Sequence, residues 1–298
     1  MNLPGHVTLR EVGPRDGLQN EQIFIETENK AQLIQMLAQA GINDIEVTSF
    51  VNPKAVPQHR DAELLLSTLP PLPGVKLSAL VGNVKGVERA LNVGVKSLVL
   101  AISASETHNL RNVNKSKAES LKEIKELAQL THVNGVALRG TISATFGCPY
   151  EGKVSIDQVS QIIEVMLAEG IQEIGLADTA GLGNPLQVYQ MTKELQARFP
   201  ATEWSLHIHD TKGLGLANIL AGLQAGIRIV ETSVGGLGGC PFIPRATGNV
   251  VTEDAVYMLT EMGIKTDVDL AKVIEAASFL ADILGRKLPS KQLDLCRN

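Results

Sequence analysis

Short apolar runs alternate with longer amphipathic segments along the whole chain. The runs predict eight strands, at 7–12, 45–50, 76–81, 97–102, 137–145, 173–177, 202–210 and 228–233. Segments with apolar residues at helical spacing predict helices at 27–40, 62–66, 84–92, 117–130, 156–169, 186–198 and 216–224, and two more at 253–262 and 270–284. Thr27 is the expected N-cap of the first helix. Uninterrupted apolar runs are typical of parallel strands covered on both faces.

This alternation determines the expected fold class. Eight strand–helix units in 298 residues predict an α/β protein, a (β/α)₈ TIM barrel with extra C-terminal helices. No linker or low-complexity stretch divides the chain, so residues 1–298 are expected to form a single TIM-barrel catalytic domain. A doubly wound open sheet is the alternative, but no G-x-G-x-x-G motif follows the first predicted strand.

Composition and charge narrow the classes of partner. Hydrophobic residues make up 44% of the chain and aromatic residues only 3%, which predicts an aliphatic core. The net charge of −5 argues against a nucleic-acid partner, because phosphate binding requires clustered Lys and Arg. The sequence contains no signal peptide and no apolar run long enough to span a bilayer, so no membrane association is expected. Three widely spaced cysteines fit the reducing cytoplasm, the expected location.

The motif L-H-I-H-D ends the seventh predicted strand. Side chains two positions apart on a strand point to the same face, so His207 and His209 are expected to project together. Two neutral imidazoles supply half of a divalent-metal site. The alternative is a pair of structural histidines that bind nearby carboxylates.

Other polar residues follow the same ends of the predicted strands. Arg15 and Asp16 follow the first strand, Glu46 lies near the end of the second, Asp178 ends the sixth, and a glycine-rich loop with Cys240 and Asn249 follows the eighth. Function in a barrel gathers at the C-terminal ends of the strands. The ionisable residues are therefore expected to cluster at this one end of the barrel.

Oxygen ligands complete the predicted metal site. Asp16 supplies a carboxylate oxygen and Asn249 an amide oxygen, which with the two imidazoles gives two nitrogen and two oxygen donors. Such a set without thiolate favours octahedral Mg²⁺ or Mn²⁺ over a structural zinc. Each oxygen ligand has an alternative role. Asp16 lies in P-R-D-G, which is good turn chemistry, and Asn249 precedes a helix that it could cap.

Arg15 and Cys240 are the remaining candidates for chemistry. Arg15 could neutralise an oxyanion that forms on a carbonyl, or it could form a salt bridge at the rim with Glu46 or Asp178. Cys240 is flanked by glycines and a proline on a loop at the mouth, which suits an acid or base. The alternative for Cys240 is a small apolar filler.

With these residues collected, the chain resembles the 3-hydroxy-3-methylglutaryl-CoA lyases along essentially its whole length. The matching segments are V-G-P-R-D-G-L-Q-N-E, I-E-V-T-S-F-V, G-C-P-Y-E-G, L-A-D-T-A-G, H-I-H-D and G-L-G-G-C-P-F-I-P-R-A-T-G-N. The R-D-G and H-x-H parts also occur in a wider group of metal-dependent carbon–carbon lyases and synthases, whereas the cysteine motif is specific. A Claisen-type synthase of the same barrel group is the first alternative, and a catalytically silent binding module is the second.

The resemblance implies a reaction and a role for each candidate. The reaction is cleavage of 3-hydroxy-3-methylglutaryl-CoA to acetyl-CoA and acetoacetate, assisted by a divalent cation. The implied cation ligands are Asp16, His207, His209 and Asn249; Arg15 and Gln19 would contact the acyl-CoA substrate, Cys240 would transfer a proton, and Glu46 and Asp178 would support the site. The general base is left open between Asp16 and His207. The family resemblance also implies a homodimer.

Overall fold

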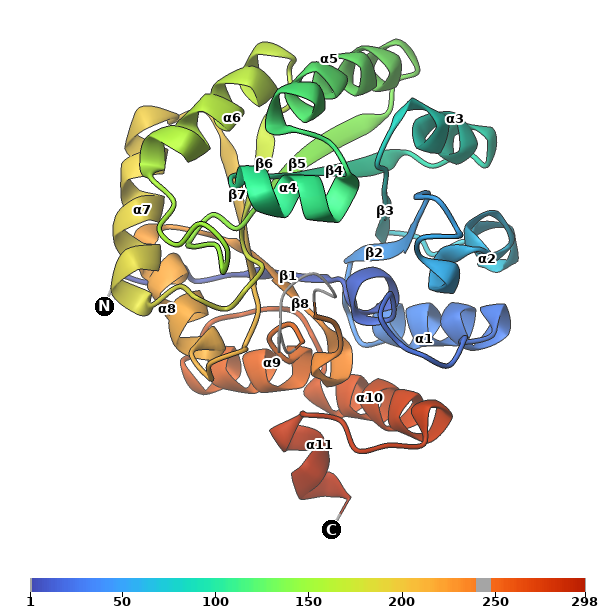
Figure 1. Cartoon of the computed structure of the whole chain (residues 1–298). Coiled ribbons are helices and arrows are strands. Elements are labelled where there is room, and N and C mark those ends of the chain that lie inside the picture. Colours follow the sequence, from blue (N-terminus) through green and yellow to red (C-terminus); the bar gives the residue numbers. More distant parts are fainter. Residues whose placement is uncertain (1, 240–247, 298) are drawn as a thin grey trace.

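The computed structural model describes residues 2–239 and 248–297. Eight parallel strands form a closed barrel in chain order, and the last strand pairs with the first (Figure 1). The strands are β1 (Thr8–Glu11), β2 (Asp44–Ser49), β3 (Lys76–Leu80), β4 (Ser97–Ser103), β5 (Ala137–Ser143), β6 (Glu173–Asp178), β7 (Glu203–Ile208) and β8 (Ile229–Thr232). The predicted (β/α)₈ barrel is confirmed, and each strand ends within two residues of its expected bounds.

Most helices surround the barrel and cover the outer face of its strands, whereas α4 lies in front of the barrel opening and α11 projects beyond α10 (Figure 1). They are α1 (Thr27–Gln39), α2 (Ala62–Thr68), α3 (Val84–Asn92), α4 (Glu106–Val113), α5 (Lys117–Val133), α6 (Ile156–Ala168), α7 (Pro185–Arg198), α8 (Gly215–Ala225), α9 (Thr252–Glu261), α10 (Leu270–Leu284) and α11 (Lys291–Cys296). All nine expected helices are present. Helices α9 and α10, which follow the last barrel strand, are the expected C-terminal helices.

Three local features differ from the sequence-based expectation. The polar segment after β4 contains a helix, α4, whose N-cap Ser105 accepts a hydrogen bond from the backbone N–H of His108 at 3.1 Å. The short helix α11 was also unexpected, and Ser290 caps it in the same way. Both helices start at a capping serine, and neither is longer than eight residues. Thr27 is not an N-cap: Glu26 has that position, and the Thr27 hydroxyl donates to Asp61 at 2.8 Å.

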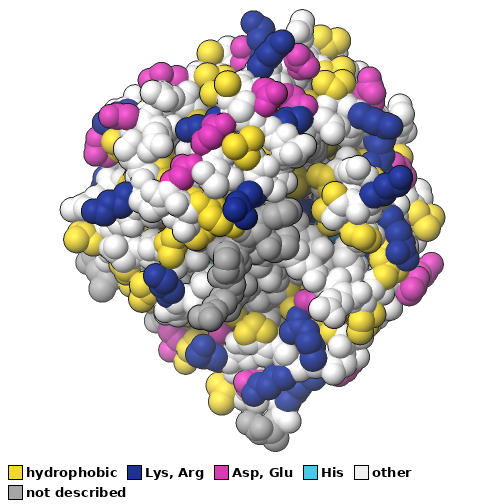
Figure 2. Space-filling model, viewed as in Figure 1, with side chains coloured by type: hydrophobic (Ala, Val, Ile, Leu, Met, Phe, Trp, Pro, Cys, Tyr) yellow, Lys and Arg dark blue, Asp and Glu magenta, His cyan; other side chains and the backbone are white. Residues whose placement is uncertain are grey.

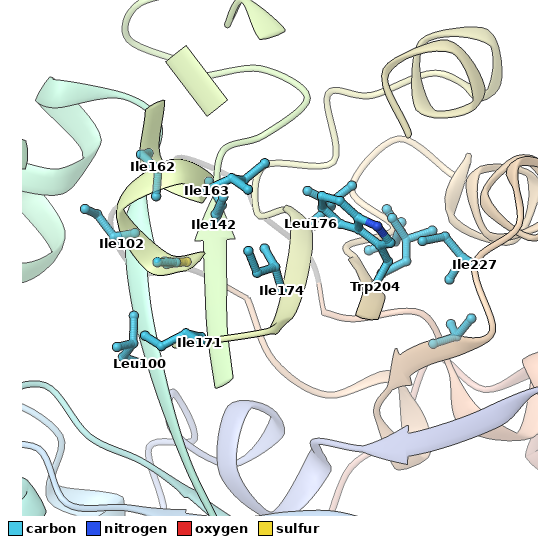
Figure 3. Packing of buried hydrophobic residues seen from close by; sticks show 14 of the residues in the cluster. Leu100, Ile102, Ile142, Ile162, Ile163, Ile171, Ile174, Leu176, Trp204 and Ile227 are labelled. Carbon is cyan, nitrogen blue, oxygen red and sulfur yellow. The ribbon is translucent and has the colours of Figure 1, made fainter. Parts of the chain in front are cut away.

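The core lies mainly between the strands and the surrounding helices, and it is aliphatic as the composition predicts. In Figure 3, Ile142 of β5 and Ile174 of β6 lie near Ile163 of α6, all of them buried. A second cluster of buried aliphatic side chains joins α1 to α10. The barrel interior is different, because Arg10, Glu46, Arg139 and Glu231 are buried on its strands.

Candidate functional site

Asp16, His207 and His209 converge at the C-terminal end of the barrel. One potential ligand atom from each residue lies within 4.8 Å of the other two, and all three side chains are buried. The Nε2 atoms of the two histidines are 3.1 Å apart, and His209 Nε2 is 3.9 Å from Asp16 Oδ2. Two imidazole nitrogens and a carboxylate oxygen turned toward one point form a donor set that suits a divalent cation.

Asn249 lies beside this group, held against the histidine strand by an isolated bridge to His209. Its Nδ2 donates to Asp16 Oδ2 at 2.8 Å. Its Oδ1 is buried, and no donor among the described residues reaches it. The alternative role as a helix cap is wrong, because the N-cap of α9 is Val251 and no side chain caps that helix. A buried amide oxygen without a partner fits a fourth ligand to the cation.

Asp16 and Arg15 both lie on the tight turn Gly13–Gly17 that follows β1. The turn packs closely on the strand end beside it, since a Cβ atom at Gly17 would lie 2.8 Å from Ser233 Oγ. Both guanidinium contacts of Arg15 are carboxylates: Nε donates to Glu46 and Nη1 donates to Asp16. The expected rim salt bridge between Arg15 and Glu46 is therefore present, and Glu46 fixes the direction of the guanidinium.

Asp178 and Gln19 take different positions around this centre. The Asp178 carboxylate accepts hydrogen bonds from the backbone N–H groups of Leu182 and Gly183, both at 2.9 Å. It is thus bound to the loop after β6 and forms no ion pair with Arg15 among the described residues. Gln19 Nε2 donates to Asp16 Oδ1 at 2.8 Å. Gln19 therefore helps to orient Asp16.

The charges of this site strongly affect the ionisation of Asp16. Burial alone would raise the pKa of Asp16, but the nearby positive charges of Arg15 and of the two histidines lower it to about 2. The carboxylate is therefore ionised throughout the neutral range. An ionised oxygen ligand is what a hard divalent cation requires.

A cavity of about 530 Å³ opens from the site toward α4. Arg15, Asp16, Gln19 and both histidines line it, as do Arg111, Asn112 and Lys115 from α4 and the segment after it. Several Lys and Arg side chains lie on this face of the molecule (Figure 2). The cavity is large enough for an extended small molecule, with cationic side chains in its wall.

The cysteine loop is only partly described. Cys240 lies outside the described residues, which stop at Gly239 and resume at Gly248. Gly239 lines the cavity, and its carbonyl oxygen accepts a hydrogen bond from Asn20 Nδ2. The described chain thus reaches the cavity immediately before Cys240.

Comparison with known proteins assigns the family. The HMGL-like family model matches residues 6–280. A hydroxymethylglutaryl-CoA lyase of Bacillus subtilis is 45% identical over 298 residues, which cover 100% of both chains. The chain belongs to the hydroxymethylglutaryl-CoA lyase family. The crystal structure of the Bacillus subtilis HMG-CoA lyase aligns with a TM-score of 0.96 over 100% of both chains. An HMG-CoA lyase from Acinetobacter baumannii, in complex with coenzyme A and 3-methylmalate, aligns with a TM-score of 0.95 at 40% identity, covering 99% of this chain and 96% of that one.

This member of the lyase family has a further buried carboxylate that sequence reasoning missed. Glu231 on β8 lies on the side of the His207 ring that faces away from His209, and its Oε2 is 3.0 Å from His207 Nδ1. Burial alone would lower the pKa of His207, but Glu231 raises it. The sequence held one signal, an acidic residue inside the apolar run of the eighth strand. A carboxylate on one ring nitrogen fixes the imidazole tautomer and leaves the other nitrogen for a metal.

Proposed function

We propose that this protein is a hydroxymethylglutaryl-CoA lyase that cleaves 3-hydroxy-3-methylglutaryl-CoA to acetyl-CoA and acetoacetate. The observation that carries the proposal is the convergence of Asp16, His207 and His209 beside Arg15 at one end of the 530 Å³ cavity. Full-length identity of 45% to a named lyase supports the same reaction. The barrel and its C-terminal helices would act as one catalytic domain over residues 1–298.

The cation would be held by Asp16, His207, His209 and Asn249. The donors are two imidazole nitrogens, an ionised carboxylate and an amide oxygen that lacks a donor among the described residues. This chemistry favours Mg²⁺ or Mn²⁺. When bound, the cation would orient the substrate and lower the pKa of its C3 hydroxyl group.

Arg15 and Cys240 would act on the acetyl part of the substrate. A base removes the C3 hydroxyl proton, the C2–C3 bond breaks, and its electron pair passes to the thioester as an enolate. The Arg15 guanidinium, held by Glu46, would stabilise the negative charge on the thioester oxygen. Cys240 would then return a proton to C2, which gives acetyl-CoA.

The base is either Asp16 or His207. A pKa of about 2 makes the Asp16 carboxylate a weak proton acceptor. Glu231 raises the pKa of His207, but the Nε2 atom that would accept the proton is also the atom that would bind the cation, so both candidates stay open. Asp178 would act indirectly, because its carboxylate organises the loop that carries Thr179, a residue of the cavity wall.

The wall of the cavity suits an acyl-CoA. Arg111, Asn112 and Lys115 would contact the phosphate-bearing part of coenzyme A, because cationic and amide side chains favour phosphate oxygens. The related Acinetobacter baumannii lyase contains coenzyme A. The face drawn in Figure 2 therefore becomes the entry side for the substrate.

Assembly and location follow the family expectation. We propose a homodimer in the cytoplasm that binds neither nucleic acid nor membrane. In the described part of the chain, no helix has both the length and the apolar character needed to cross a membrane. The net charge of −5 also disfavours nucleic acid.

An assay on 3-hydroxy-3-methylglutaryl-CoA, with and without a chelator, tests the proposed function. The purified protein should release acetoacetate with Mg²⁺ or Mn²⁺ and stop when the chelator is added. Absence of acetoacetate at any concentration of either metal would favour a silent binding barrel. Thiol release from acetyl-CoA and a 2-oxo acid, without cleavage of 3-hydroxy-3-methylglutaryl-CoA, would favour the Claisen-type synthase.

A further inference from the structure

The connection from β2 to α2 contacts two different parts of the molecule. Val51, Asn52 and Val56 line the substrate cavity. The next three residues form a 3₁₀ turn, Pro57–His59, that packs against the residues after Arg15. One connection therefore contacts both the cavity and the chain segment that carries the substrate-facing arginine.

Gln58 makes the main contact of this turn. Its side chain is only 4% exposed. Nε2 donates to the carbonyl oxygens of Glu21 and Ile23, both at 2.6 Å, and Oε1 accepts from the backbone N–H of Ile25 at 3.3 Å. Three backbone groups of an irregular segment thus depend on one buried amide for their hydrogen bonds, and each would be costly to leave unpaired.

His59 holds the same segment nearer to the reaction. Its Nε2 is 3.1 Å from the carbonyl oxygen of Arg15, and its Nδ1 is 3.5 Å from the hydroxyl of Thr48 on β2. Burial lowers the pKa of His59 to about 3, helped by the charges of Lys30 and Arg15, so the ring is neutral. A neutral ring has one N–H, and a carbonyl can only accept. The proton therefore lies on Nε2 and points at Arg15.

The turn Pro57–His59 is itself held in place by side chains of α1. Lys30 on α1 is buried, and its Nζ donates to the carbonyl oxygen of Gln58 and to Asp61 Oδ1, the latter at 2.8 Å. Asp61 also accepts from the Thr27 hydroxyl at 2.8 Å. The turn is thus held to the start of α1, so Gln58 and His59 present their donors from a rigid support.

We propose that Gln58 and His59 are positioning residues for Arg15. They fix the backbone on both sides of Gln19 and Asn20, and so keep the guanidinium directed between Glu46 and the cation site. This rests on the proposed function, in which Arg15 stabilises the thioester oxyanion. Displacement of such a group by about 1 Å costs on the order of 100-fold in rate, with little change in substrate binding.

Gln58→Met tests this role, since methionine has nearly the same shape and lacks every donor and acceptor of the amide. In the full-length enzyme we expect kcat to fall by roughly 10- to 100-fold. KM and the Mn²⁺ dissociation constant should change little. Gln161→Met, on an exposed position of α6, is the matched control and should leave all three values unchanged.

A double-variant cycle separates positioning from general structural support. In an Arg15→Gln background, measured by single turnover with excess enzyme, Gln58→Met should have almost no further effect on the rate. The inference would be overturned if Gln58→Met lowered the rate in the Arg15→Gln background as much as it does in the wild type. A loss of Mn²⁺ affinity as large as the loss of rate would also overturn it. Should Gln58→Met fail to fold, His59→Leu enters the same cycle, with His59→Gln expected to restore kcat through its amide N–H. A wild-type enzyme that does not cleave 3-hydroxy-3-methylglutaryl-CoA would instead overturn the proposed function.

Discussion

Two groups of charged side chains are buried inside the same barrel, one at its mouth and one below it. At the mouth, Asp16 and the two histidines turn their ligand atoms toward a common point. Below the mouth, Arg10 lies among three carboxylates: Asp44 at 2.8 Å, Glu173 at 2.7 Å and Glu231 at 3.1 Å. The sequence pattern predicts the group at the mouth but not the group below it.

The difference lies in which atoms each group brings together. The Arg10 guanidinium contacts Asp44 through Nη2 and both Glu173 and Glu231 through Nη1, which is the arrangement of a structural ion network. The mouth brings two imidazole Nε2 atoms to 3.1 Å and leaves Asn249 Oδ1 without a donor from the described residues. Buried charge alone therefore does not identify a metal site, whereas imidazole nitrogens and a carboxylate oxygen that converge on one point do.

Of the variants that test this comparison, Arg10→Met is expected to have the largest effect, a loss of folding stability. Arg10→Met leaves two buried carboxylates and the partly buried Glu173 without their shared cation, so the free energy of unfolding should fall by about 3–5 kcal/mol. Urea denaturation followed by circular dichroism measures it. Arg198→Met, on the exposed face of α7, removes an arginine with two carboxylate partners at the surface and should cost far less. Equal losses in the two variants would contradict a structural role of the lower group.

The sequence predicts which residues meet at the mouth better than which residues meet in the lower group, and the reason is physical. His207 and His209 share a strand, so the period of two is enough to place them together. Arg10 instead lies directly opposite Asp44 on β2 and Glu231 on β8 in the strand register. The pairing with β8 exists only because the barrel closes, and no local pattern carries that information.

Local chemistry also explains the other differences. Helix α4 begins at its N-cap Ser105, but Leu110 and Val113 are the only apolar residues in it, so its polar sequence indicated a loop. Asn249 precedes a helix in sequence, but the loop turns its side chain to Asp16. The direction of the Asn249 side chain depends on a tertiary contact, which the residue pattern does not contain.

Glu231 belongs to both groups, because Oε1 contacts Arg10 and Oε2 contacts His207. Glu231→Gln keeps the size of the side chain but removes the charge behind the imidazole. We expect Mn²⁺ affinity to fall by about 10- to 100-fold, measured by calorimetric titration.

Glu173→Gln is the matched control, since Glu173 contacts Arg10 and lies on β6, away from the histidine pair. This variant should lower stability and leave Mn²⁺ affinity intact. If both variants lower Mn²⁺ affinity equally, the whole lower group supports metal binding at the mouth. The proposed separation of the two groups would then be wrong.

The smallest expected effect concerns two carboxylates outside both groups. Glu253 on α9 accepts from the backbone N–H of Gly235 at 3.0 Å, and Glu11 on β1 accepts from the backbone N–H groups of Gly13 and Val234. Within the described residues, neither has an ion-pair partner. Burial raises the pKa of Glu253 to about 8 and that of Glu11 to about 7.

These shifts predict a loss of stability as pH rises. Because the folded pKa of each carboxyl exceeds its unfolded value, the folded state binds more protons, and the stabilisation present at low pH is lost as pH rises through 7 and then 8. For Glu253 the free energy of unfolding should fall by about 1 kcal/mol between pH 7 and pH 8.5. Glu253→Gln cannot ionise and should flatten this part of the curve in urea titrations at each pH. Glu261→Gln, at the exposed end of α9, should retain the slope of the wild type. An unchanged slope in Glu253→Gln would contradict the raised pKa of Glu253. It would place this carboxyl beside a cation, as Arg10 is beside the carboxylates below the mouth.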